Sequence, residues 1–147
     1  MSIIVDTSVV VGAFERKDPA AIDALKASGG PSIRSMFVHA ELLSGIERAT
    51  PATVAVRRRT YAAYLTITSA EDAPPAPTDL AKQFALMTAL AARQGIRIGQ
   101  NDRWILAEAI TRGAGVLTAD QRMHNMGTHA TASFDIPGLT VLVDLAT

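Results

Sequence analysis

The most constraining feature of this sequence is a short apolar run that ends in an acid. Residues 3–5 read Ile-Ile-Val and are followed directly by Asp6. Three consecutive β-branched residues predict a short strand that is buried in the fold. Burying an ionised carboxylate alone costs several kcal/mol, so Asp6 requires a partner at the end of this strand. That partner is either a cation from another side chain or a metal ion that further acids help to hold.

Apolar strand-like segments alternate with helical ones along the chain. The expected strands are 3–6, 32–36, 116–118 and 139–143, with 65–69 as a strand or an extended connection; the expected helices are 7–14, 19–27, 37–48, 51–64, 78–94 and 101–112. Thr7 or Ser8, Thr78 and Asn101 are the expected helix caps. Residues 73–77 form a proline-rich connector, and 121–138 predict no clear element. This alternation predicts one α/β sandwich domain whose central, mainly parallel sheet is flanked by helices.

Composition excludes several classes of function. The 147 residues contain no cysteine, which rules out disulfides, zinc–thiolate sites and thiol nucleophiles. No basic segment precedes the first apolar run, and no run approaches the roughly 18 residues of a membrane span, so we expect a soluble cytoplasmic protein. The formal net charge is zero, which is atypical of a nucleic-acid binder. A net charge of zero is compatible with nucleic-acid binding if several of the acids are sequestered around metal ions.

Four acids fall where a parallel sheet concentrates its chemistry. Asp6 and Asp120 each follow an expected strand, and sites in open parallel sheets gather at the carboxyl ends of strands. Asp102 lies in the first turn of a helix, whose positive end favours the charged carboxylate. Glu41 lies in an apolar helical stretch, so it is either exposed or directed at a positive group. Hard oxygen ligands of this kind suit Mg²⁺ or Mn²⁺, which activate water for attack at phosphorus.

Simpler interpretations of the same residues stay open. Asp6 can be a cap or an ion-pair partner, Asp120 a turn residue and Glu41 a solvated helix acid. His124 and His129 are most simply polar loop residues. The segment His39–Glu41 has the H-x-E pattern of zinc deaminases but lacks their downstream cysteines. No phosphate-binding glycine motif supports nucleotide binding.

Four segments resemble, in order, the motifs of PIN-domain nucleases. They are Ile-Ile-Val-Asp-Thr-Ser-Val-Val-Val (3–11), His-Ala-Glu-Leu-Leu-Ser-Gly-Ile-Glu-Arg (39–48), Gly-Ile-Arg-Ile-Gly-Gln-Asn-Asp-Arg-Trp-Ile-Leu-Ala-Glu-Ala (95–109) and Gly-Val-Leu-Thr-Ala-Asp (115–120). The resemblance covers nearly the whole chain. The length of the chain and its late segment, Ile-Pro-Gly-Leu-Thr-Val (136–141), resemble those of the VapC-type toxins of type II toxin–antitoxin pairs. Residues 121–135 depart from that pattern, being longer and richer in His and Thr.

The resemblance implies a PIN-like sandwich and a Mg²⁺-dependent (or Mn²⁺-dependent) endoribonuclease that cleaves structured or loop RNA. It also implies a cognate antitoxin as partner and a homodimer. The implied metal-binding and catalytic acids are Asp6, Glu41, Asp102 and Asp120, supported by Thr7, Ser8, Asn101 and Thr118. An RNA-processing nuclease and a non-catalytic binding module of the same fold are the alternatives.

Basic and aromatic residues near the motifs are candidates for substrate contacts. Arg97, Arg103 and Arg122 flank the third and fourth motifs, so we expect them to contact RNA phosphates. The run 57–59 of three arginines is either a solvated helix face or a contact for RNA or antitoxin. Trp104 is expected to serve packing or an interface rather than base stacking.

Overall fold

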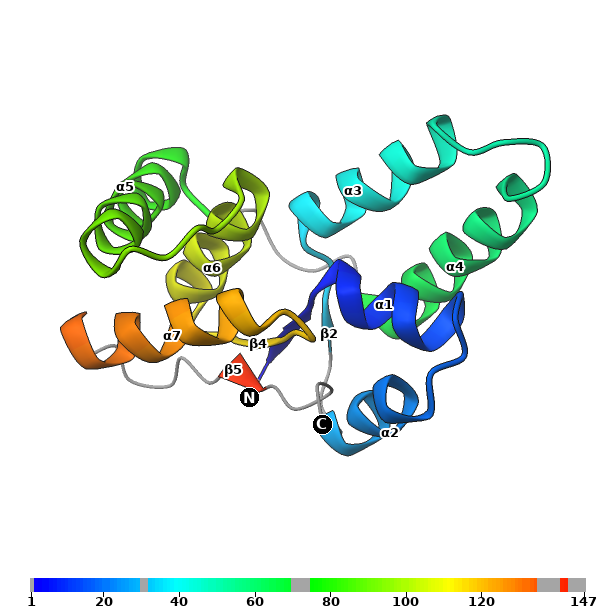
Figure 1. Ribbon diagram of the computed structural model, residues 1–147, viewed down its shortest axis with the longest axis horizontal. Helices are drawn as coiled ribbons and strands as arrows, with labels where there is room; N and C mark the ends of the chain where they lie inside the picture. The colour runs from blue at the N-terminus through cyan, green and yellow to red at the C-terminus, as the bar shows by residue number, and fades with distance from the viewer. Residues whose placement is uncertain (1, 30–31, 70–74, 135–140, 143–147) are drawn as a thin grey trace.

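A parallel β-sheet forms the centre of the computed structural model, which describes residues 2–29, 32–69, 75–134 and 141–142 (Figure 1). The strands are β1 (Ile3–Val5), β2 (Ser32–Ile33), β3 (Thr68–Ser69), β4 (Gly115–Leu117) and β5 (Val141–Leu142). Their order is β3-β2-β1-β4-β5, and every neighbouring pair is parallel. The predicted α/β sandwich with a mainly parallel central sheet is thus confirmed.

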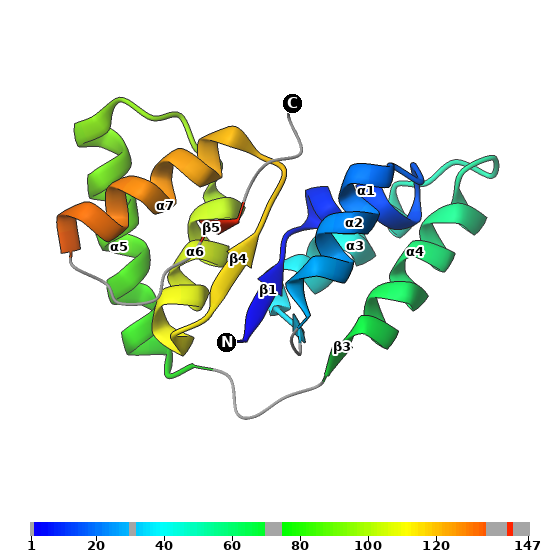
Figure 2. The ribbon, with the colours of Figure 1, turned by 90° about the horizontal axis from the view of Figure 1, so that it is seen from below.

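Helices cover the sheet in two groups. They are α1 (Thr7–Phe14), α2 (Pro19–Ser28), α3 (Met36–Glu47), α4 (Val54–Ile67), α5 (Pro77–Gln94), α6 (Gln100–Arg112) and α7 (Gln121–Phe134). In Figures 1 and 2, α1–α4 lie to the right of the sheet and α5–α7 to its left. The chain moves from β1 to β2 and β3 in one direction and then returns past β1 to β4 and β5. Right-handed crossovers place the helices of these two runs on opposite faces.

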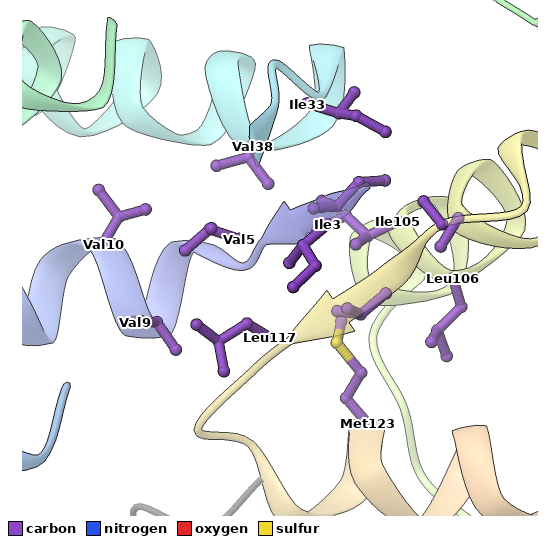
Figure 3. Close-up of a cluster of buried hydrophobic side chains, with 14 of the residues drawn as sticks. Ile3, Val5, Val9, Val10, Ile33, Val38, Ile105, Leu106, Leu117 and Met123 are labelled. Carbon is purple, nitrogen blue, oxygen red and sulfur yellow. The ribbon is translucent and has the colours of Figure 1, made fainter. Parts of the chain in front are cut away.

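The core is built around β1. Ile3, Ile4 and Val5 are all buried, because helices pack against both faces of this central strand. Figure 3 shows Val9 and Val10 of α1 on one side and Ile105 and Leu106 of α6 on the other. Burying each such side chain contributes roughly 1.5–3 kcal/mol, so the position of β1, and of Asp6 at its end, is strongly determined.

Two element boundaries differ from the sequence-based expectation because of local capping and packing. The predicted strand 32–36 ends early, since Ser35 caps α3 by accepting hydrogen bonds from the N–H groups of Phe37 and Val38. Helix α4 begins three residues later than expected from Pro51 and continues through Ile67, leaving only Thr68–Ser69 as an edge strand. Buried Tyr64 anchors the last turns of α4 in the core.

The expected caps were wrong at three helices. Helix α1 begins at Thr7 directly after Asp6, so neither Thr7 nor Ser8 precedes it. Pro77, not a cap at Thr78, begins α5, because the first helical position needs no N–H. Gly99 precedes α6, which places Asn101 inside the first turn and frees its side chain for another role.

The polar segment after β4 folds into helix α7, which the sequence did not predict. Met123, Met126 and Ala130 are fully buried, and their spacing places them on one helix face. His124 and His129 are therefore helix residues and not loop residues. Glycine, threonine and histidine are weak helix formers, so packing of this face against α5 and the sheet stabilises α7 more than propensity does.

No helix in the described part of the chain is both long and apolar enough to cross a lipid bilayer. The expected last strand, 139–143, is described only at Val141–Leu142, and the expected connector 73–77 only from Pro75; the rest of both lies outside the described residues.

A buried acid ties α3 to α6, the two helices that carry Glu41 and Asp102. Glu108 is only 2% exposed and accepts hydrogen bonds from Ser35 Oγ (2.8 Å) and Arg112 Nε (3.1 Å). Glu108→Ala is expected to lower the free energy of unfolding by about 3 kcal/mol, because it leaves the buried Ser35 hydroxyl and the half-buried Arg112 guanidinium without their acceptor. Urea denaturation measures this change. Glu47→Ala, at an exposed site on α3, serves as the matched control and should change stability by less than about 0.5 kcal/mol.

Candidate metal centre

The first two candidate site residues lie where the direction of the connections reverses in the sheet. The chain leaves β1 towards β2, whereas it leaves the neighbouring strand β4 towards β5. Ligand sites of open parallel sheets occur at such a reversal, outside the carboxyl ends of the two strands. Asp6 follows β1, and Thr118 follows β4 at the same end of the parallel pair.

Hydroxyl groups hold the carboxylate of Asp6. Asp6 is 4% exposed, and its Oδ2 accepts hydrogen bonds from Ser8 Oγ at 2.6 Å and from Thr118 Oγ1 at 2.8 Å. The same two hydroxyls also accept backbone N–H groups, of Ala119 and Asp120 respectively, at 3.0 Å. Ser8 and Thr118 therefore join the segment after β1 to the segment after β4, and they orient Asp6.

Glu41 and Asp102 complete a cluster of three carboxylates. Asp6, Glu41 and Asp102 each offer an oxygen, and these oxygens lie within 4.8 Å of one another. Helix α3 brings in Glu41, and the first turn of α6 brings in Asp102. The side-chain amide of Asn101 donates a hydrogen bond to Glu41 Oε1. Asn101, which the sequence suggested as a cap, instead orients this acid from the neighbouring helix.

The three acids destabilise one another's charged forms. Burial raises the pKa of Asp6, and burial followed by the negative charge of Asp6 raises the pKa of Glu41. The pKa of Asp102 rises to about 7, first through burial and then through the charges of Asp6, Asp120 and Glu41. No arginine, lysine or histidine of the described chain forms an ion pair with any of the three acids. The charge of Arg122 lowers the pKa of Asp102 only in part, so the cluster concentrates negative charge without an ion-paired protein cation.

Asp120 lies near this cluster but outside it. Its charge raises the pKa of Asp102, yet it is not one of the three acids whose oxygens converge. Asp120 Oδ1 accepts a hydrogen bond from the backbone N–H of Arg122 at 2.8 Å, in the first turn of α7. Asp120 thus has the turn role that the sequence allowed and also contributes to the field at the cluster.

Thr7 supplies an unsatisfied polar atom next to the acids. Its Oγ1 is buried, and no hydrogen bond of normal geometry satisfies it in the described chain, although the hydroxyl lies close enough to Glu41 to lower the pKa of that acid. An unsatisfied buried hydroxyl costs about 1–3 kcal/mol unless a water or ligand engages it. Three converging carboxylates and this hydroxyl form a set of hard oxygen donors that fits a divalent cation.

The remaining candidates divide into packing residues and basic residues. Trp104 stacks between Phe37 and Phe84, with ring centroids 5.6 Å and 3.8 Å away, so its predicted packing role is confirmed. In the run 57–59, Arg57 donates to the carbonyl of Gly45, whereas the next two arginines are exposed. Arg97, Arg103 and Arg122 line one cavity beside α6.

Sequence reasoning missed Ser35 and Glu108, which hold α3 against α6. A serine before an apolar helical run is a capping signal that was available in the sequence. No comparable signal identified Glu108, because its partner Ser35 lies 73 positions away in the sequence.

Comparison with known protein families defines the class of this protein. The model of the PIN domain family matches residues 3–128, a range that contains all three clustered acids and Asp120. The chain belongs to the PIN domain family, whose members are nucleases that use divalent metal ions. No curated protein sequence matches the chain.

Several solved structures share the fold over almost the whole chain. VapBC-1 from nontypeable Haemophilus influenzae superposes with a TM-score of 0.69 at 16% identity, covering 97% of each chain. VapBC2 from Rickettsia felis, bound to a DNA fragment from its promoter, has a TM-score of 0.66 at 19% identity, covering 97% of this chain and 98% of the other. VapBC-5 from Mycobacterium tuberculosis, of a toxin–antitoxin family, reaches 25% identity and a TM-score of 0.63, with coverage of 96% and 95%.

Proposed function

We propose that this chain is a Mg²⁺-dependent or Mn²⁺-dependent endoribonuclease and the toxin of a type II toxin–antitoxin pair. The observation that carries the proposal is the convergence of Asp6, Glu41 and Asp102 within 4.8 Å, with no ion pair to a basic side chain of the described chain. Membership of the PIN domain family supports nuclease chemistry at this cluster. The likeness to VapBC toxin–antitoxin structures, one of them at 25% identity, supports the toxin assignment.

Asp6, Glu41 and Asp102 would hold the divalent ion, and the surrounding residues would keep them in place. When bound, such an ion supplies charge stabilisation at the scissile phosphate and activation of the attacking water. Ser8 and Thr118 fix the Asp6 carboxylate, and Asn101 fixes that of Glu41. Asp120 has one oxygen engaged by the Arg122 N–H, so its other oxygen is available to a water or to a second ion. Preorganised ligands of this kind need no rearrangement during the reaction.

We further propose that the chain acts in the cytoplasm, is inhibited by a cognate antitoxin and forms a homodimer. Its surface offers apolar contacts: Met36 and Leu43, both on α3, are 63% and 41% exposed. They are seven residues apart, so they project from the same side of the helix. These two side chains are the large hydrophobic residues that the described chain leaves exposed, so this side of α3 is the contact surface that we propose for a protein partner.

The proposed activity is tested with purified protein and matched single-stranded RNA and DNA oligonucleotides. We expect RNA cleavage with Mg²⁺ or Mn²⁺ that leaves 5′-phosphate and 3′-hydroxyl ends, and no cleavage when EDTA removes the metal. Sequencing of new 5′ ends after induced expression identifies the cellular target. Cleavage of DNA in preference to RNA, or cleavage that persists in EDTA, would contradict the assignment.

A further inference from the structure

A cavity beside the metal centre combines a basic and an apolar lining. Its volume is about 490 Å³, and it lies between α5, the segment 96–99 and the first turns of α6 and α7. Arg97, Arg103 and Arg122 supply positive charge, and no acid of the described chain lines it. Ala91, Ile96 and Ile98 provide an apolar wall. The volume lies within the range of about 300–1,000 Å³ that is typical of small-ligand pockets.

Arg103 is held in place, and one of its donors is left unused. Its Nη1 donates to Thr88 Oγ1 at 3.0 Å, and its guanidinium lies 5.1 Å from the centre of the Phe84 ring. Its Nε is buried without a hydrogen-bond partner in the described chain. An arginine fixed in this way loses little side-chain entropy when it binds an anion, which favours phosphate recognition.

The cavity adjoins the acids of the metal centre. Gly99 lines it, and a Cβ atom on Gly99 would lie 3.8 Å from Asp102 Oδ2. Arg103 follows Asp102 in the first turn of α6, and the Arg122 backbone binds Asp120. The cavity thus reaches the residues that neighbour two of the acids, Asp102 and Asp120. The positively charged arginines of the cavity therefore lie directly beside the acidic cluster.

We propose that this cavity binds the nucleotide next to the scissile phosphate of a single-stranded RNA. The arginines contact its phosphate, and the apolar wall receives its base. The proposal rests on the proposed nuclease function, since the metal centre holds the scissile phosphate and the neighbouring nucleotide must lie within a few ångströms of it. The pairing of cationic and apolar surfaces matches the two parts of a nucleotide, as in other single-strand binding grooves.

The test measures RNA binding apart from cleavage. A fluorescein-labelled single-stranded RNA of ten nucleotides is titrated in EDTA with the natural protein and with the double variant Arg97→Ala/Arg122→Ala, at several salt concentrations. Both arginines are exposed, so the variant should keep its fold, as circular dichroism and thermal unfolding will verify. We expect binding at least about 10-fold weaker and a salt slope reduced by about 1.4, since each phosphate contact in a single strand contributes about 0.7.

The matched control is Arg58→Ala/Arg59→Ala, which removes two exposed charges from α4. Equal losses in both double variants would mean that RNA binding does not depend on the cavity in particular, and they would overturn the proposal. Unchanged RNA binding by the Arg97/Arg122 variant would also overturn it. An acidic peptide of ten residues is titrated as a second probe. A variant that loses binding of this peptide but keeps RNA binding would indicate a protein partner and would likewise overturn the proposal.

Cleavage kinetics distinguish this proposal from the proposed function. With Mg²⁺, the Arg97/Arg122 variant should raise KM about 10-fold and change kcat by less than about threefold, because a flanking site contributes binding rather than chemistry. A natural protein that binds RNA through these arginines but cleaves nothing would refute the nuclease function and leave the binding site intact. Cleavage with an unchanged KM in the variant would refute the binding site alone.

Discussion

Asp6→Asn is expected to reduce metal-dependent RNA cleavage by at least about 1,000-fold while the chain remains folded. Asparagine has nearly the same shape as aspartate and keeps an oxygen that can accept from Ser8 and Thr118. It removes one of the three converging negative charges that would hold a divalent ion, and thereby much of the affinity for that ion. Initial rates of RNA cleavage at saturating Mg²⁺ measure the effect.

The same substitution should not lower the stability of the metal-free protein. A loss of cleavage by a stable variant can then be distinguished from misfolding. Burial raises the pKa of Asp6, so its charged form is unfavourable in the metal-free protein. The metal-free Asp6→Asn variant should therefore be at least as stable to urea as the natural chain, and it should gain little from added Mg²⁺. Asp23→Asn, at an exposed site on α2, is the matched control and should leave cleavage and stability unchanged. Full cleavage by Asp6→Asn would exclude the carboxylate cluster as the active centre.

The stability of the metal-free protein is expected to fall as the pH rises. The pKa of Asp102 is about 7 in the folded chain, compared with an ordinary value of 3.8. The folded state therefore binds more protons than the unfolded state between these pH values, and the free energy of unfolding decreases as pH increases. We expect a loss of about 1–2 kcal/mol from about pH 4 to about pH 8, less than the full pKa shift implies because solvent screens this partly exposed group.

Metal should reverse this loss, because bound cations and protons compete for the same oxygens. A Mg²⁺ concentration of about 100 times the Kd at pH 8 should stabilise the protein by about 2.7 kcal/mol at that pH. The same concentration should stabilise it much less at pH 5, where protons compete for the oxygens. Urea denaturation across this range, with and without Mg²⁺, measures both effects. Asp102→Asn isolates the contribution of Asp102 and should flatten the pH dependence. A natural metal-free chain whose stability rises relative to Asp102→Asn over this range would contradict the charge arrangement at the site.

Much of the fold could be predicted because its signals are local. The apolar β-branched run 3–5 indicated a buried strand, and it is the central strand of the sheet. Glycines that end α5 and α6, Gly95 and Gly113, adopt left-handed backbone angles that glycine reaches at little cost. Helix α7 was missed because its residues have poor helix propensity, and its buried methionines gain their free energy only against the rest of the core.

The sequence alone determined which residues could carry the chemistry: acids at strand ends and helix starts, with no cysteine to compete. Only the tertiary structure decided which of them meet. Asp6, Glu41 and Asp102 converge, whereas Asp120 stays beside them and caps α7. The tertiary structure also decided that Asn101 donates a hydrogen bond to Glu41 and that Ser35 donates one to Glu108. The physical reason is that strand order and the docking of α3 against α6 depend on packing between distant segments, which local patterns do not encode.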